Sequence, residues 1–130
     1  MKLLLVISIV CFSAATGFGQ LNTCDSRDDC EKILLANPIN SQAHYRIGEM
    51  FLEQKNYQTA ALHFRAALVG DLTPKWTEVW SYVELGKIYD VTHQRDRAVK
   101  QYEKARATKD NTRGAINEAT KYLESPYEGR

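Results

Sequence analysis

The chain has 130 residues and carries 17 Lys and Arg against 16 Asp and Glu. This length predicts a single domain. The near balance of charge argues against nucleic acid or an acidic membrane surface as a partner, because both are recognised by a cationic patch.

The N-terminal residues 1–19 have the pattern of a secretory signal peptide. Lys2 is followed by an apolar run from Leu3 to Phe12, and then by mostly small residues up to Gly19, which are the three regions of such a signal. We expect cleavage after Gly19, with cleavage after Ala15 as the alternative. An uncleaved anchor is the other interpretation, but the uncharged stretch 3–19 is shorter than the roughly 20 apolar residues that a membrane span needs. The sequence therefore predicts an exported protein, secreted or periplasmic, that meets the membrane only transiently through its signal.

Loss of the signal removes one cysteine and one charge. Cys11 and Lys2 leave with it, so the mature chain keeps 16 basic and 16 acidic residues and has no net charge. Cys24 and Cys30 remain, and an even cysteine count in an exported chain favours a disulfide. Two free thiols or a metal pair is the alternative. Six helical residues rise about 9 Å, beyond the roughly 7 Å limit between bridged Cα atoms, so a disulfide requires Cys24 to lie outside a helix that starts at Asp25 or later.

Apolar periodicity in residues 20–124 predicts an all-α domain of six helices, followed by a tail over residues 125–130. The expected helices span residues 25–36, 41–54, 57–68, 74–91, 97–107 and 113–124. Their expected N-terminal caps are Asn40 or Ser41 for the second helix, Thr73 for the fourth with Pro74 at its first position, Asp96 for the fifth, and Thr112 for the sixth.

The second and third helices share an internal pattern with the fourth and fifth. The shared positions are His44, Ile47, Gly48, Phe51, Ala60, Phe64 and Ala67 in the first copy, and Tyr82, Leu85, Gly86, Tyr89, Ala98, Tyr102 and Ala105 in the second. The pattern resembles the tetratricopeptide repeat (TPR), a helical hairpin with a large residue, Leu-Gly, an aromatic, and then Ala, aromatic, Ala at fixed offsets. The copies are 38 residues apart, against the usual 34 or so in that family.

The resemblance implies a short right-handed α-solenoid of about two and a half TPR-like repeats plus a C-terminal capping helix. The helix over 25–36 then stands where the second helix of a preceding hairpin would be. Gly48 and Gly86 lie inside helices, where each costs about 1 kcal/mol relative to Ala. We expect the missing side chains to allow close packing within each hairpin, and the aromatic residues to fill the core.

No pattern of residues points to catalysis or to a cofactor or metal. The three histidines, His44, His63 and His93, form no metal-binding or nucleophile motif, and no Gly-rich phosphate loop is present. Glu49 and Glu53 are more consistent with a solvated or peptide-facing pair than with a catalytic one. We therefore expect a protein that is not an enzyme.

Some TPR domains bind a partner's C-terminal carboxylate through Lys, Asn and Arg on the first helices of successive hairpins. The matching positions here are Tyr45, Glu49, Glu84, Gly114 and Glu118. These residues have the wrong size and charge, so a carboxylate-clamp ligand is excluded.

The resemblance implies instead a binding face on the concave side. The residues one position onward from the core face are Tyr45, Glu49, Leu52, Trp80, Val83, Lys87 and Asp90, continued by Asn117 and Lys121 on the last helix. They mix aromatic, apolar and charged groups, as peptide-binding surfaces do. The other interpretation of Tyr45 and Trp80 is that they only cover the edge of the core.

The function that the sequence predicts is a non-catalytic protein–protein interaction module, an exported TPR-like scaffold that binds a protein or peptide. The alternative is an accessory or detached domain of a larger exported enzyme or envelope assembly.

Overall fold

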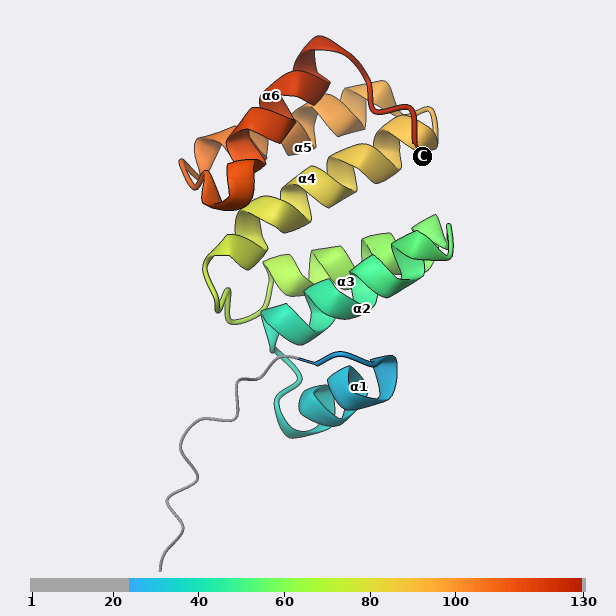
Figure 1. The fold of residues 1–130 in the computed structure, drawn as a ribbon, viewed down its shortest axis with the longest axis vertical. Helices are drawn as coiled ribbons and strands as arrows, with labels where there is room; N and C mark the ends of the chain where they lie inside the picture. The colour runs from blue at the N-terminus through green and yellow to red at the C-terminus, as the bar shows by residue number, and fades with distance from the viewer. Residues whose placement is uncertain (1–23, 130) are drawn as a thin grey trace, which may run out of the picture.

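The computed structural model describes residues 24–129, and every regular element in that range is a helix (Figure 1). The helices are α1 (Arg27–Ala36), α2 (Ser41–Glu53), α3 (Tyr57–Leu68), α4 (Trp76–Val91), α5 (Arg95–Ala107) and α6 (Ala115–Glu124), with a short 3₁₀ helix η1 (Thr112–Gly114) before α6. The expected all-α class is confirmed. The predicted signal peptide and its cleavage site lie outside the described residues.

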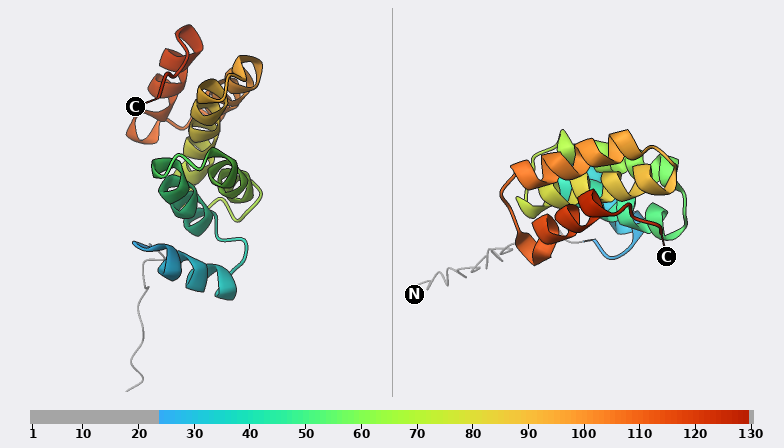
Figure 2. Two further views of the ribbon diagram at one scale, coloured as in Figure 1. Left: turned by 90° about the vertical axis from the view of Figure 1, so that its right-hand side faces the viewer. Right: turned by 90° about the horizontal axis from the view of Figure 1, so that it is seen from above.

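Consecutive helices pack against one another along the chain. The closest pairs are the hairpins α2–α3 and α4–α5, while α1 packs on α2, α3 on α4, and α6 on α5. Helix α4 also contacts α2 and α6, so these three helices follow one another along one side of the molecule (Figure 2). We call this side the α2–α4–α6 face. No helix within residues 24–129 is long and apolar enough to cross a membrane.

Gly48 and Gly86 accommodate aromatic rings from the second helix of their own hairpins. A Cβ atom on Gly48 would lie 2.8 Å from the Phe64 ring, and one on Gly86 would lie 2.3 Å from the Tyr102 ring. Both rings are fully buried. The recurrence of glycine at this position is therefore explained by ring packing against the helix backbone, which offsets the low helix propensity of glycine.

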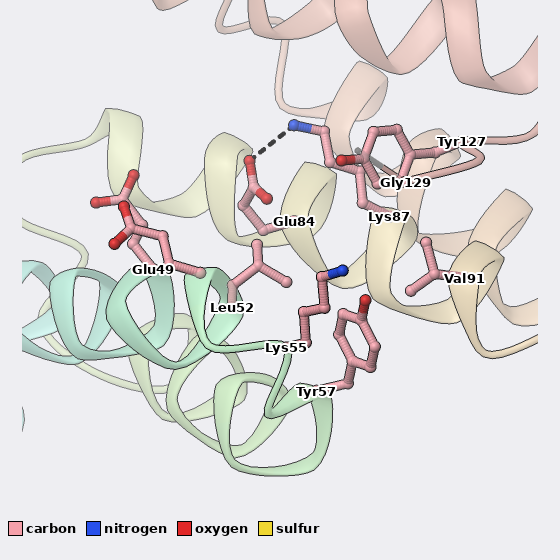
Figure 3. Close-up of a pocket in the computed structure, with 10 residues that line it drawn as sticks. Glu49, Leu52, Lys55, Tyr57, Glu84, Lys87, Val91, Tyr127 and Gly129 are labelled. Atoms are coloured by element: carbon pink, nitrogen blue, oxygen red, sulfur yellow. Dashed lines mark hydrogen bonds and ion pairs between the residues drawn. The ribbon is translucent and has the colours of Figure 1, made fainter.

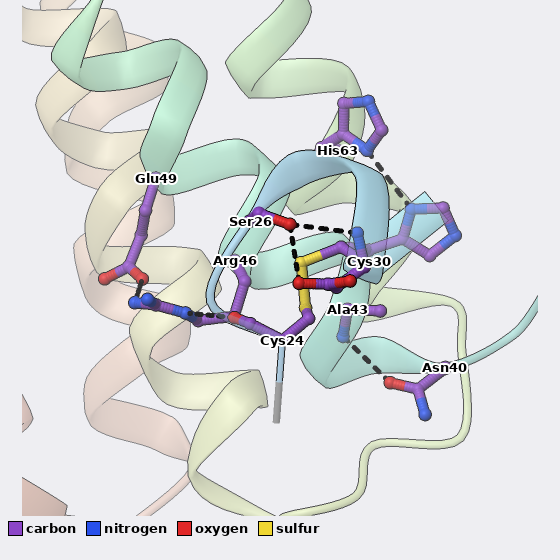
Figure 4. The surroundings of a disulfide bond; sticks show 10 residues. Cys24, Ser26, Cys30, Asn40, Ala43, Arg46, Glu49 and His63 are labelled. Carbon is purple, nitrogen blue, oxygen red and sulfur yellow. Dashed lines mark hydrogen bonds and ion pairs between the residues drawn. A yellow bond between two sulfur atoms is a disulfide. The ribbon is translucent and has the colours of Figure 1, made fainter. Parts of the chain in front are cut away.

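The disulfide has the geometry that its spacing requires. Helix α1 starts at Arg27 with Ser26 as its cap, and Cys24 lies before it at a Cα–Cα distance of 5.0 Å from Cys30 (Figure 4). Both cysteines are buried together with Ala43 and Ile47 of α2. The bond thus ties the segment before α1 to that helix, while packing alone holds α1 on α2, and it is compatible with an exported protein.

Four of the expected helix starts are wrong, since α1 starts at Arg27 rather than residue 25 and α4, α5 and α6 also start elsewhere, while Asn40 is confirmed as the cap of α2. Helix α4 starts at Trp76 without a side-chain cap, and the expected cap Thr73 instead makes hydrogen bonds to the side chain and backbone of Asp71. Helix α5 starts at Arg95, before the expected cap Asp96. Before α6, the side chain of Asn111 accepts from the N–H groups of Ile116 and Asn117, and Thr112 lies in η1.

Candidate functional site

The α2–α4–α6 face is hollowed between α2 and α4 into a pocket of about 390 Å³ (Figure 3). We call it the α2–α4 pocket. Its lining residues are Glu49, Leu52 and Glu53 of α2, Lys55 and Tyr57 at the turn into α3, Glu84, Lys87 and Val91 of α4, and Tyr127 and Gly129 of the C-terminal tail. This volume is at the lower end of the range for ligand sites, roughly 300–1,000 Å³.

Helical spacing brings these side chains together. Glu84, Lys87 and Val91 are at positions i, i+3 and i+7 of α4, which share one face of a helix. Glu49 and Leu52 have the same relation on α2. The pocket thus has apolar groups from both helices, with carboxylates beside them.

Lys87 is the most enclosed cation of this region. Its Nζ lies 3.0 Å from Glu84 Oε1 and 2.7 Å from Glu118 Oε1, with 13% of the side chain exposed. Burial opposes its charge, but the two carboxylates outweigh burial and raise the pKa of Lys87. The rings of Trp80, Tyr122 and Tyr127 each lie less than 6 Å from Nζ, within the range of cation–π attraction. Lys87 therefore stays protonated and fixed in place.

Glu84 is the buried carboxylate of the pocket. The residue is 8% exposed. Burial raises its pKa, Lys87 opposes this, and the nearby charges of Glu118 and Glu49 raise it further. Glu49 is paired with Arg46 at 2.6 Å. The carboxylates of Glu49, Glu84 and Glu118 thus share only two cations, Arg46 and Lys87, at the centre of the α2–α4–α6 face.

The C-terminal tail folds back onto α4 and forms one wall of the pocket. The N–H of Tyr127 donates to Asp90 Oδ2 at 2.9 Å, and its ring packs edge-on against Tyr122 with 5.2 Å between ring centroids. Asp90 also accepts from Arg95 and from the Tyr102 hydroxyl. The tail is therefore anchored to a carboxylate that the hydrophobic core already holds.

The structure brings together three of the predicted binding residues and buries three others. Glu49, Leu52 and Lys87 line the α2–α4 pocket. Tyr45, Val83 and Asp90 are buried, so the expectation that they lie on an open surface is wrong. Helix α4 packs against α2, α3, α5 and α6, so a rotation of about 100° from its core-facing side reaches a second packed face rather than solvent.

The remaining predicted residues lie at or beyond the edge of the pocket. Trp80 is half-buried, and its indole N–H donates to the carbonyl of Thr112 at 3.0 Å. Asn117 and Lys121 are exposed on α6 and do not line the pocket. Tyr45 contacts Phe64 and Trp76, which agrees with the interpretation that it covers the core.

The sequence analysis missed several residues of the pocket wall. The missed residues are Lys55, Tyr57, Val91 and Gly129, because each reaches the pocket only through the tertiary fold. Glu84 carried a detectable signal, since a carboxylate directly before the core residues Leu85 and Gly86 is unusual unless it has a partner or a ligand.

His44 and His63 form a hydrogen-bonded pair on the other side of α2. Their Nδ1 atoms are 3.2 Å apart, and His44 Nε2 is 3.0 Å from the carbonyl oxygen of Pro38. In the neutral rings His44 donates to Pro38 and accepts from His63, because a carbonyl can only accept. Burial, together with the His44 ring, lowers the pKa of His63. Residues 24–129 contain no cluster of three or more His, Cys, Asp or Glu side chains that could hold a metal ion.

Comparisons of the chain with protein-family models, with curated proteins and with solved structures find no match. The repeat pattern and the geometry of the α2–α4 pocket are therefore the features of the chain that bear on its function.

Proposed function

We propose that this protein is an exported, non-catalytic interaction module of the TPR type that binds an extended segment of a partner protein in the α2–α4 pocket. The observation that carries the proposal is the composition of that pocket. Leu52 and Val91 supply apolar surface, Tyr57 and Tyr127 supply aromatic rings, and charges of both signs surround them. Such mixtures give affinity through burial and specificity through a few polar groups.

The tail supports the choice of an extended segment as the ligand. After α6 the backbone becomes extended at Ser125, and the N–H of Tyr127 is bound by the buried carboxylate of Asp90. The α2–α4–α6 face thus already binds one stretch of non-helical backbone by the contacts that a peptide ligand would use: a main-chain hydrogen bond and an aromatic side chain in an aromatic pocket.

The charges in the pocket favour binding over catalysis. A general acid or base must be able to exchange a proton with a substrate. Lys87 is held between Glu84 and Glu118, and its raised pKa keeps it protonated. Export is supported by the Cys24–Cys30 disulfide, which is typical of oxidising compartments.

The test is a pull-down of the mature protein from its native exported compartment with two matched variants. Leu52→Gln removes apolar surface from the pocket. Leu62→Gln makes the same chemical change on α3, where Leu62 is exposed and is not part of this pocket. We expect a partner that the parent and Leu62→Gln both retain and that Leu52→Gln loses. Equal retention by all three proteins would contradict the proposed site.

A further inference from the structure

We propose that the partner segment inserts a Lys or Arg side chain into the α2–α4 pocket, with Glu84 as its principal hydrogen-bond acceptor; this inference rests on the proposed function. It concerns the chemistry of the ligand rather than the existence of the binding site.

First, the α2–α4 pocket contains more carboxylates than ammonium groups. Its lining contains the carboxylates of Glu49, Glu53 and Glu84, against the ammonium groups of Lys55 and Lys87. Two residues outside the lining also take part, since Glu118 shares Lys87 at 2.7 Å and Arg46 pairs with Glu49 at 2.6 Å, which leaves four carboxylates against three cations. A cationic side chain would therefore complement the pocket, whereas an anionic one would add to the repulsion among the carboxylates.

The second argument is the state of Glu84 itself. Only its Oε1 atom is hydrogen-bonded, to Lys87, and its Oε2 atom has no hydrogen-bond partner among residues 24–129. This Oε2 atom is nevertheless open to solvent, because it is not among the buried polar atoms without a partner, so it offers an acceptor inside the pocket. The pKa of Glu84 is raised, since burial and the neighbouring carboxylates disfavour its charge. An N–H group of an incoming cation can donate to this Oε2 atom and also stabilise the charge of the carboxylate.

The third argument is the shape of the pocket around Glu84. Leu52 and Val91 offer apolar surface to the methylene groups of a long side chain, as in other sites where Lys and Arg bury their stems. Tyr57 lies on the α3 side of the pocket and Tyr127 on the tail side (Figure 3). Aromatic rings beside a bound cation strengthen its binding further. An aliphatic ligand would fill the same volume but remove solvent from the Oε2 atom of Glu84 without donating a hydrogen bond to it.

The experiment is a selection of random peptides displayed on phage against the full mature protein with its disulfide intact. Enriched peptides are then synthesised with a fluorophore, and their dissociation constants are measured by fluorescence anisotropy. Each peptide is compared with a copy in which its Lys or Arg is replaced by norleucine, a neutral side chain of similar length. Both are measured on the parent, on Glu84→Gln, and on Glu103→Gln, which alters an exposed Glu of α5 outside the pocket.

We expect the enriched peptides to share a Lys or Arg, and its replacement by norleucine to weaken binding to the parent by about tenfold or more, as for one charge-assisted hydrogen bond. Glu84→Gln should reduce this preference to near unity, and Glu103→Gln should keep it. The preference is a ratio measured within each variant, so a partial loss of folded protein does not change it.

Two results would overturn the inference, and they differ in what they mean for the proposed function. Peptides whose binding depends on Leu52 but not on a Lys or Arg, or a cation preference that survives Glu84→Gln, would refute the cation while leaving the binding module in place. A selection that yields no peptide sensitive to Leu52→Gln would refute both.

Discussion

Replacing Gly86 by Ala tests the packing that repeats between the two hairpins. A Cβ atom at this position would lie 2.3 Å from Cε1 of Tyr102 and 2.7 Å from two further ring atoms. The ring cannot move aside freely, because Tyr102 is fully buried and its hydroxyl donates to Asp90 at 2.9 Å. The substitution must therefore strain the helix pair and also displace the Tyr102 ring from that hydrogen bond.

The expected cost combines three contributions. Overpacking a core costs about 1–3 kcal/mol, and a hydrogen bond to a charged acceptor contributes about 1.5–3 kcal/mol. The better helix propensity of Ala returns about 1 kcal/mol. We therefore expect Gly86→Ala to lower the free energy of unfolding by about 3 kcal/mol, measured by urea denaturation followed by circular dichroism at 222 nm.

Gly48→Ala is the matched control in the first hairpin. Its Cβ would contact the Phe64 ring at 2.8 Å, and a phenylalanine ring has no hydroxyl to hold it in place. We expect a cost of about 1 kcal/mol, because only overpacking and helix propensity contribute. In a Tyr102→Phe background Gly86→Ala should approach this smaller cost. The reasoning is refuted if Gly86→Ala is as stable as the parent or more stable, as at an exposed helix position.

Three further predictions concern the disulfide, the buried carboxylate and the tail. Replacing both Cys24 and Cys30 by Ser should lower the free energy of unfolding by about 2 kcal/mol for so short a loop, with faster hydrogen exchange confined to α1; unchanged exchange there would contradict the role of the bond. The folded-state pKa of Glu84 is raised above its ordinary value of 4.5. Protonated Glu84 therefore adds to the free energy of unfolding at pH values below 4.5, and this stabilisation is lost as the pH rises through the folded-state pKa. A carbon-13 titration of Glu84 should thus have its midpoint above 4.5, and a midpoint at or below that value would refute the burial argument. Tyr127→Ala should weaken peptide binding in the α2–α4 pocket by removing one wall, with little change in the melting of the helices; unaltered affinity would show that the tail takes no part in the site.

The helices could be predicted from the sequence because their apolar periodicity is local. The expected starts of α2 and α3 and the expected ends of α1, α3, α4, α5 and α6 match the structure. The starts of α4 and α6 could not be predicted in the same way. Helix α4 has no side-chain cap, since Thr73 is bonded to Asp71 instead, and the first turn of α6 is capped by Asn111 from outside the helix. Several residues near each start could act as a cap, and the sequence does not say which of them, if any, does.

The candidate site was predictable on α2 and only in part on α4. Glu49 and Leu52 line the pocket as expected, because one side of α2 faces it. On α4 the residues one position onward from the core face include Val83 and Asp90. Both were predicted to lie on the binding surface, and both are buried. A helix with neighbours on several sides has more than one buried face, and periodicity alone does not distinguish them. The part played by Tyr127 depends on where the tail turns after α6.

The most direct test of the proposed binding site is photo-crosslinking from single positions in the native compartment. A benzophenone amino acid is placed at position 52 in one protein and at position 62 in a second. Leu52 lines the α2–α4 pocket, and Leu62 is exposed on α3 outside it. The proposal predicts a covalent adduct with a partner protein from position 52, absent from position 62, and lost when an excess of a pocket-binding peptide is added. Adducts from position 62 alone, or adducts from position 52 that the peptide does not reduce, would contradict it.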